Sequence, residues 1–341
     1  MQIKVLSSES ESAWDNYVVQ HAETTVFHRV GWKGVIERSM GYTGSYLMAL
    51  DNDQIVGIYP LFILSTGLFG TFGISLPFVN YGGIAADSLE VERLLINEAE
   101  TIGRNVGSRY IELRQRYPLK YKLPSTDRKV VSVIPLKGGP GEVYSRLHQN
   151  VRNKIRKAEK NGVVVQKGVE YLSDFYCIYA RNLRDLGTPV LTRCFFELMV
   201  DTFPQHVRIY RAIRQGKPIG AKVVLIDRDT CYFVWSATIR EDLCYAPVHA
   251  MNWAAIEDAY AAGCQNIDFG RSTAESTHQN FKKYWGGESQ ALPWVYQLLN
   301  CDEIPGLHKE NRKFSLAIAL WKRLPLFLSR ILGPPIARRL P

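Results

Sequence analysis

The chain repeats one pattern of strands and helices. Residues 46–64 read as two strands joined by a polar turn, and residues 208–226 repeat that order. An alanine and a glycine at positions 49 and 57 recur 163 residues later, at positions 212 and 220. One hairpin can agree by chance, so the weight of this match depends on whether the elements that follow agree as well.

The elements that follow each hairpin do agree. A helical segment stops at Gly107 and leads to an apolar strand over residues 110–113, and another stops at Gly263 and leads to residues 266–269, 156 positions later. The small difference between the two offsets corresponds to one change of loop length. The sequence therefore predicts a duplicated α/β unit.

Each copy reads as a helix, an antiparallel hairpin, a second helix and a strand that ends in a carboxylate. This order predicts the fold class α/β (α+β), with two tandem domains that each hold a mixed central sheet flanked by helices. The glycines and proline of residues 137–141 neither continue a helix nor suit a strand, so we place the boundary there. The expected domains are residues 1–136 and 137–300, followed by a basic helical tail over residues 301–341.

The composition is that of a folded protein, because 46% of the 341 residues are hydrophobic and 22% are charged. The six cysteines contain no CxxC pair, and the start of the chain lacks the apolar core of a signal peptide. These features indicate a cytoplasmic protein. The seven histidines are scattered without metal-ligand spacing, so no metal is expected.

The net charge of +9 is concentrated in two segments. Residues 145–160 carry six basic side chains against one acidic side chain, and residues 309–341 carry eight against one. Such local basicity favours anionic partners at defined places on the protein.

The first basic segment reads as an amphipathic helix. Its apolar stripe comprises Leu147, Val151, Ile155 and Ala158. Beside that stripe, His148, Arg152 and Arg156 form a row one turn apart. This helix is either an ordinary solvated surface or a cradle for the phosphates of RNA, a nucleotide or a lipid carrier.

Cations and aromatic rings gather near the end of the second copy. Residues Phe281–Trp285 hold two lysines among aromatic side chains and run into Gly286–Gly287, about a dozen positions after the strand end Asp268–Arg271. Together these segments could line an acyl-transfer site. Attack of an amine on an ester or thioester puts negative charge on the carbonyl oxygen, and an ammonium fixed about 3 Å away stabilises that charge by a few kcal/mol.

An ordered set of motifs resembles the FemAB-like branch of the GNAT superfamily. The resemblance extends over residues 1 to about 300. The motifs that carry it are Ser75–Phe78, Tyr81–Gly83, Arg152–Val163, Gly216–Ala221, Ile267–Arg271, Phe281–Lys282 and Trp285–Gly287.

The resemblance implies an N-acyltransferase with two GNAT-like domains and the acyl donor on the second. The best-known members of this family transfer an amino acid from aminoacyl-tRNA to the amine of a peptidoglycan precursor, and others are associated with exopolysaccharide loci. The resemblance gives the lysine of the Phe-Lys pair, here Lys282, the role of stabilising the negative oxygen of the tetrahedral intermediate.

The predicted site residues fall into three groups. We predict catalytic roles for Lys282, Asp268 and His278, with His249 as a further candidate base; substrate contacts for Phe281, Tyr284, Trp285, Arg271 and Tyr81; and phosphate or donor binding for Arg152 and Arg156. Two of these roles have structural alternatives. Lys282 could be a solvated loop lysine, and Asp268 could cap the turn after its strand or pair with Arg271.

Departures from the family pattern leave the substrates open. Ile36 stands where peptidoglycan-bridge members carry a lysine, and the stretch over residues 185–204 leaves no room for their coiled-coil arm. The Gln-x-x-Gly-x-Gly loop of coenzyme A dependent GNAT enzymes, which holds a pyrophosphate at a helix start, is missing before either second helix. The expected donor is aminoacyl-tRNA or acyl-CoA, used as a co-substrate without any bound cofactor.

The tail suggests a location. Residues 314–332 alternate apolar clusters with Lys322, Arg323, Pro325 and Arg330, which argues against a membrane-spanning helix. Such a segment either lies on the anionic inner face of a membrane or packs on the protein's own surface.

The sequence therefore predicts an N-acyltransferase that acts on an amine of a cell-envelope or polysaccharide precursor, with that glycan or lipid-linked precursor, tRNA and an anionic membrane surface as partners. One alternative is an acetyl-CoA-dependent N-acyltransferase that acts on an amino sugar. The other is a non-catalytic module that binds RNA or a membrane.

Overall fold

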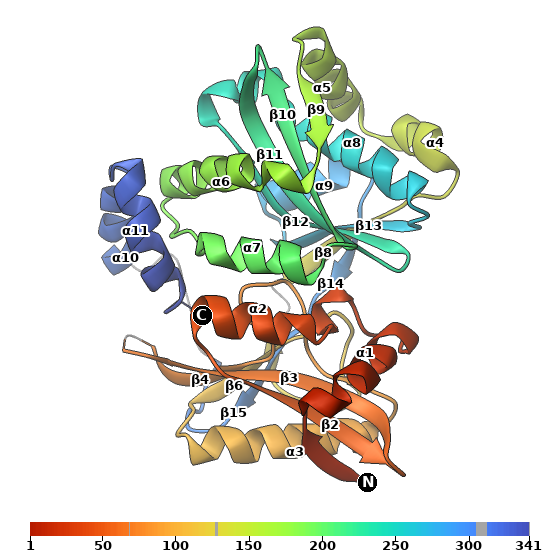
Figure 1. Ribbon diagram of the computed structural model, residues 1–341, viewed down its shortest axis with the longest axis vertical. Coiled ribbons are helices and arrows are strands. Elements are labelled where there is room, and N and C mark those ends of the chain that lie inside the picture. The colour runs from red at the N-terminus through yellow and green to blue at the C-terminus, as the bar shows by residue number, and fades with distance from the viewer. Residues whose placement is uncertain (68, 127–128, 305–311, 341) are drawn as a thin grey trace. The chain divides into compact units, whose positions relative to one another are not determined.

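The computed structural model of the chain describes residues 1–67, 69–126, 129–304 and 312–340 (Figure 1). The chain divides into two compact units, each built around one mixed β-sheet. Unit 1 comprises Met1–Val130 and the segment that contains strand β15, and unit 2 comprises Val131–Gln290 and the C-terminal helices.

Unit 1 contains a mixed sheet with the strand order β1-β2-β3-β4-β6-β15-β7, and β5 pairs with β3. Its elements are β1 (Gln2–Val5), the 3-10 helix η1 (Ser8–Ser10), α1 (Glu11–Gln20), η2 (Val26–His28), α2 (Gly31–Met40), β2 (Gly44–Asp51), β3 (Gln54–Thr66), β4 (Gly70–Ile74), β5 (Ala85–Ala86), α3 (Leu89–Asn105), β6 (Tyr110–Arg114), β7 (Ser125–Thr126) and β15 (Trp294–Leu298).

Unit 2 contains a mixed sheet with the strand order β14-β8-β13-β12-β11-β10-β9. Its elements are β8 (Lys129–Pro135), α4 (Gly139–Arg146), α5 (Gln149–Lys160), β9 (Val164–Lys167), η3 (Val169–Tyr171), α6 (Leu172–Leu186), α7 (Arg193–Thr202), β10 (Val207–Arg214), β11 (Lys217–Asp227), β12 (Thr230–Thr238), η4 (Arg240–Tyr245), α8 (Pro247–Ala261), β13 (Asn266–Thr273), α9 (Thr277–Tyr284), β14 (Glu288–Ala291), α10 (Arg312–Trp321) and α11 (Leu326–Ala337).

The two sheets confirm the duplication predicted from the sequence. Ala49 pairs with Gly57 in the β2–β3 hairpin, and the matching Ala212 pairs with Gly220 in the β10–β11 hairpin. In both hairpins the register shifts immediately after the alanine. In both units a later strand then joins in parallel, β6 beside β4 and β13 beside β12.

The repeated glycine has a packing reason in both units. A Cβ atom on Gly57 would lie 2.5 Å from Cγ1 of Val91 on α3, and one on Gly220 would lie 2.9 Å from Cε of Met251 on α8. Each glycine therefore lets the following helix approach the hairpin closely, which a strand residue with a side chain would prevent.

The observed division differs from the expected domain boundaries in two places. β8 precedes residue 137 but lies between β14 and β13 in the sheet of unit 2. β15 follows the second copy but lies between β6 and β7 in the sheet of unit 1, where Val295 pairs with Leu113. Pairing between strands that are far apart in the chain decides to which sheet β8 and β15 belong. A local sequence pattern does not reveal which strands will pair.

Candidate active site

β12 and β13 pair in parallel at their first residues and then separate. Tyr232 and Asp268 form the last pair of their register. β12 continues to Thr238 and β13 to Thr273 without further pairing to each other, and both strands lie wholly within the described residues. Opposite β11, β12 also bulges at Val234. Beyond Tyr232 and Asp268 the two strands are therefore no longer held together by the ladder that joins their first residues.

Gly270 redirects the backbone of β13 just after the separation. Its φ of 69° is a left-handed conformation that glycine adopts without a steric penalty. The Gly270 N–H donates to Oδ1 of Asp268 at 2.6 Å, and its carbonyl oxygen accepts from Nζ of Lys282 at 2.7 Å. Nζ of Lys282 also donates to the carbonyl oxygen of Arg271 at 2.9 Å. These bonds tie the lysine of α9 to β13 beside the separation.

Lys282 carries its charge in a half-buried position. Burial lowers the pKa of its amine to about 8, Asp268 opposes this shift, and Arg271 adds to it. The side chain is therefore mostly an ammonium at neutral pH. An ammonium has three N–H donors, and the two carbonyl oxygens use two of them, so within the described part of the chain one donor remains for an anionic oxygen.

A chain of aromatic contacts runs from β12 to α9. The ring centroids of Phe233 and Phe269 are 4.7 Å apart, those of Phe269 and Trp285 are 5.9 Å apart, and those of Trp285 and Phe281 are 6.3 Å apart. The Trp285 side chain is completely buried. Because these rings exclude water from their surroundings, they strengthen electrostatic interactions nearby.

His249 belongs to the same aromatic cluster. Its ring centroid lies 5.5 Å from that of Phe281 and 5.8 Å from that of Trp285. Burial, with a smaller contribution from Lys154, lowers the pKa of His249 to about 4. The imidazole is therefore neutral at physiological pH, and among the described residues its Nδ1 has no hydrogen-bond partner.

The structure brings together most of the predicted residues of β13 and α9. The residues that lie together are Asp268, Arg271, Phe281, Lys282 and Trp285. The hydrogen bond from the Gly270 N–H also means that Asp268 caps the bend of its strand. The roles of these side chains in catalysis or substrate binding remain predictions.

Other predicted residues lie outside this cluster. His278 is exposed and precedes Lys282 by one turn of α9. The Tyr284 side chain is 45% exposed and stacks on His148, with 4.6 Å between the ring centroids. Tyr81 belongs to unit 1, where it is fully buried. The substrate contacts predicted for Tyr284 and Tyr81 remain predictions.

The basic helix forms as expected over α5. Val151 and Ala158 of the apolar stripe are buried, and Nη1 of Arg152 donates to the carbonyl oxygen of Ser145 at 2.8 Å. Arg156 is exposed and lines a groove of about 310 Å³ between α5 and α8.

The groove between α5 and α8 has mixed charge. Its walls include Trp253 and the carboxylates of Glu159 and Glu257 as well as Arg156. Two carboxylates near one guanidinium weaken the attraction of this groove for a phosphate. The phosphate-binding role of Arg156 remains a prediction.

Sequence reasoning missed Lys222, on β11. Its side chain is only 3% exposed, and its Nζ lies 3.7 Å from the ring centroid of Phe233. The pKa of this amine is lowered to about 7, mainly by burial and also by the charge of Lys282, against an opposing contribution from Cys231. The available signal was a single lysine inside the otherwise apolar run from Ile219 to Ile226.

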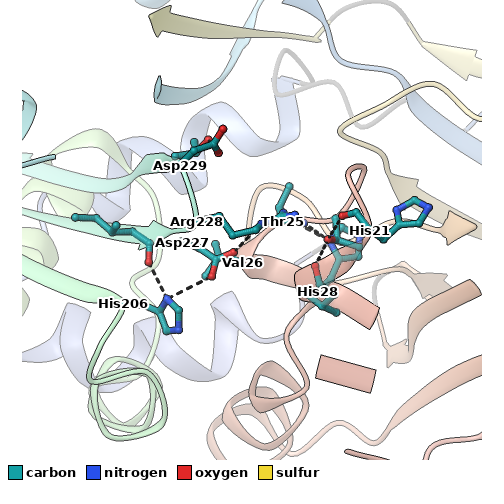
Figure 2. A network of polar contacts seen from close by, with 12 residues as sticks. His21, Thr25, Val26, His28, His206, Asp227, Arg228 and Asp229 are labelled. Carbon is teal, nitrogen blue, oxygen red and sulfur yellow. Dashed lines mark hydrogen bonds and ion pairs between the residues drawn. The ribbon is translucent and has the colours of Figure 1, made fainter. Parts of the chain in front are cut away.

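A separate group of charged side chains lies near the turn between β11 and β12. Figure 2 shows His206 beside Asp227, with 3.5 Å between Nδ1 and Oδ1. Nε of Arg228 lies 3.5 Å from Oδ2 of the same carboxylate. In unit 1, the Thr25 N–H donates to Nδ1 of His28 at 3.0 Å. These contacts stabilise local turns, and we assign no catalytic role to them.

Two further properties of the described residues bear on the site. No group of three or more His, Cys, Asp or Glu side chains in residues 1–67, 69–126, 129–304 and 312–340 is arranged to hold a metal ion. Every helix in that same part of the chain is too short or too polar to cross a membrane.

Comparisons with known proteins agree with this architecture. Residues 145–283 match the family described as acetyltransferase (GNAT) domain. The comparison with curated protein sequences returned no match.

Several solved structures share the fold of most of the chain. FemX is 13% identical, with a TM-score of 0.68, and the alignment covers 88% of this chain and 98% of FemX. A tandem GNAT protein from the clavulanic acid biosynthesis pathway is 12% identical, with a TM-score of 0.55, and the alignment covers 89% of this chain and 99% of that protein. The L-PGS of Bacillus licheniformis is 9% identical, with a TM-score of 0.57, and the alignment covers 97% of this chain and 98% of L-PGS.

The fold and the family match indicate the same kind of domain. Residues 145–283 are similar to GNAT acetyltransferase domains, and the chain shares the fold of FemX and of a tandem GNAT protein. The GNAT domain that the family match identifies, residues 145–283, contains α5, β11–β13, Lys222 and all but the end of α9.

Proposed function

We propose that this protein is an acyltransferase that transfers an aminoacyl or acyl group to an amine of a cell-envelope or polysaccharide precursor. The observation that carries the proposal is the placement of Lys282. Its ammonium is held by two carbonyl oxygens of β13, beside the separation of β12 and β13 and next to buried aromatic rings. This is the environment in which a fixed cation stabilises a developing oxyanion most strongly.

The proposed reaction is the attack of an amine on an activated carbonyl carbon. The amine nitrogen forms a C–N bond, and the carbonyl oxygen becomes negative and accepts a hydrogen bond from Lys282. The bond to the leaving group then breaks, the carbonyl re-forms, and the proton that the amine nitrogen gives up passes to the sulfur or oxygen of the leaving group. Asp268 accepts a hydrogen bond from the N–H of Gly270, and the carbonyl oxygen of the same residue accepts one from Lys282, so this carboxylate acts as a positioning residue.

The donor is either an acyl-CoA or an aminoacyl-tRNA. The clavulanic acid pathway structure is described as being without AcCoA, and this reference to acetyl-CoA favours a thioester donor for a tandem GNAT fold. The separation of β12 and β13 would suit the extended, amide-containing arm of such a donor. An aminoacyl-tRNA is supported by the basic face of α5, which carries Arg152 and Arg156.

A transfer assay tests this proposal. The full chain is incubated with either acetyl-CoA or a mixture of charged tRNAs, together with amine acceptors that include a muramyl-pentapeptide nucleotide and glucosamine. Mass spectrometry then identifies acceptors that have gained an acyl group. Transfer from one donor class to an envelope-precursor amine supports the proposal. Transfer to glucosamine alone would favour the amino-sugar alternative. No transfer to any acceptor would contradict the proposed acyl transfer.

The C-terminal helices provide a surface that would suit a lipid-linked acceptor. One side of the α10–α11 pair is held by unit 2, where a Cβ atom on Gly187 would lie 2.5 Å from Cγ2 of Ile318 and one on Gly333 would lie 3.0 Å from Cγ1 of Val190. Figure 1 shows α10 and α11 beside α6. Nη1 of Arg184 on α6 donates to the carbonyl oxygen of Leu324, between the two helices, at 2.9 Å.

The same two helices expose large apolar side chains. Leu316, Leu320, Phe327 and Ile331 are 68%, 59%, 62% and 64% exposed. Residues 312–340 contain no aspartate or glutamate, and their basic residues are Arg312, Lys313, Lys322, Arg323, Arg330, Arg338 and Arg339. An apolar surface among cations is typical of attachment to an anionic bilayer, so we propose that this pair of helices docks on a membrane surface. Of the expected segment 314–332, the side chain of Phe314 lies outside the described residues.

A further inference from the structure

Lys222 occupies an unusual place for a charged residue. It lies in the middle of β11, where Tyr210 of β10 and Ser236 of β12 are its register partners. Its side chain is 3% exposed and contacts the face of Phe233. Among the described residues no carboxylate forms an ion pair with it. An ammonium buried in this way costs several kcal/mol unless the amine releases its proton.

The groups around Lys222 favour the neutral amine. Burial is the main cause of its lowered pKa of about 7, and the positive charge of Lys282 on α9 acts in the same direction. The thiol of Cys231 on β12 has a pKa raised by burial and is uncharged at neutral pH. On β10, the hydroxyl of Tyr210 donates to Oδ2 of Asp258 on α8 at 2.6 Å.

Lys222 contacts the aromatic cluster of the candidate active site. The ring that it contacts, Phe233, follows the last residue of β12 that pairs with β13. Phe233 contacts Phe269, which contacts Trp285 beside Lys282. A neutral amine and an ammonium are thus presented to one apolar cluster, which is the combination that proton transfer and oxyanion stabilisation require.

We propose that Lys222 is the group that accepts the proton of the attacking amine. This inference rests on the proposed acyl transfer. As the acceptor nitrogen forms its C–N bond to the donor carbonyl carbon, its N–H proton moves to Nζ of Lys222. The negative carbonyl oxygen is held by Lys282. When the bond to the sulfur or oxygen of the leaving group breaks, Lys222 returns the proton to that atom, and both lysines regain their starting states.

Three variants of the full chain test the role in catalysis. Lys222→Met keeps the length of the side chain and removes the amine, Lys222→Arg keeps a charge that does not release its proton, and Lys217→Met changes an exposed lysine of the same strand. We expect both changes at position 222 to lower kcat by about 10²-fold or more with little change in KM, whereas Lys217→Met retains activity. A Lys222→Met variant that turns over like the natural protein would overturn the inference and leave the proposed function standing.

A labelling experiment tests the inference without any transfer activity. The natural protein is treated briefly with a small acylating reagent over a range of pH, and mass spectrometry measures the modification of each lysine. A proton acceptor must be both neutral and reachable near neutral pH, so we expect the labelling of Lys222 to rise with a midpoint near pH 7. Failure of Lys222 to react, or a midpoint near the ordinary lysine value of 10.5, would refute the inference even if no substrate is found.

Discussion

Nζ of Lys282 donates a hydrogen bond to the carbonyl oxygen of Gly270 at 2.7 Å. This contact joins α9 to β13 at a residue whose left-handed backbone points its carbonyl group at the lysine. The same residue donates its N–H to Asp268. One glycine thus connects the carboxylate that ends the paired part of β13 with the cation proposed to stabilise the oxyanion.

Replacement of Lys282 by methionine should remove most of the transferase activity. Loss of one preorganised donor to an oxyanion typically lowers kcat by about 10²- to 10³-fold. The adjacent Lys283 is exposed and provides a matched control. Steady-state kinetics of Lys282→Met and Lys283→Met should therefore differ by at least tenfold in kcat. Equal rates for the two variants would remove Lys282 from the mechanism.

Replacement of Gly270 by alanine should damage activity more than stability. A side chain in the left-handed region costs on the order of 1 kcal/mol, and relief of that strain would turn the carbonyl away from Lys282. Gly263 has a φ of 84° and open space around its Cα, so Gly263→Ala carries similar strain without touching the site. Thermal unfolding should show comparable losses in both variants. Kinetics should show a large loss in Gly270→Ala alone, and equal losses would argue against this positioning role.

The activity should have a bell-shaped dependence on pH. Lys222 must be neutral to accept a proton, so kcat/KM should rise as the pH passes about 7. Lys282 must be charged, so kcat/KM should fall as the pH passes about 8. In Lys282→Arg the guanidinium stays charged, so the fall at alkaline pH should move upward. A natural enzyme whose rate is constant through both values would contradict the two assignments.

Replacement of Lys222 by methionine should stabilise the fold. In the unfolded chain the amine has its ordinary pKa of 10.5, whereas burial lowers the pKa to about 7 in the folded protein. Between these values the unfolded state binds the extra proton, so the natural protein loses stability as the pH falls from 10.5 to about 7. At pH 7 the methionine variant should melt at a higher temperature, by about 2–4 °C or more. At pH 10.5 the difference should shrink, and a lower melting temperature at both pH values would contradict the burial of an unpaired amine.

The α10–α11 surface should bind anionic vesicles. Flotation of the full chain with phosphatidylglycerol-containing liposomes is expected to carry the protein upward, and phosphatidylcholine liposomes should carry much less. A double change, Leu316→Ser with Phe327→Ser, should abolish flotation because it removes two of the most exposed apolar side chains. Leu243→Ser changes a leucine that is 55% exposed elsewhere in unit 2 and serves as the control. Equal flotation of all three proteins, or none at all, would contradict membrane docking.

Several features of the fold could be predicted from local patterns. The duplicated hairpins were visible because strand alternation, a polar turn and the paired alanine and glycine are all encoded within about twenty residues. The helix α5 was visible because its apolar positions recur at helical spacing. The placement of β8 and β15 was not predicted, since the choice of strand partner depends on segments far apart in the chain.

The candidate site shows the same limit. Sequence motifs identified Lys282, Asp268 and the aromatic residues of α9 because these lie in two short segments. Lys222 was overlooked, and the outward position of Tyr284 was not foreseen. Covalent order and periodicity are properties of neighbouring residues, and they are sufficient to specify the repeat, the helices and the motif. Burial, the shifted pKa of an amine and the contact between a lysine and a carbonyl on another element arise only when distant segments pack together and exclude water.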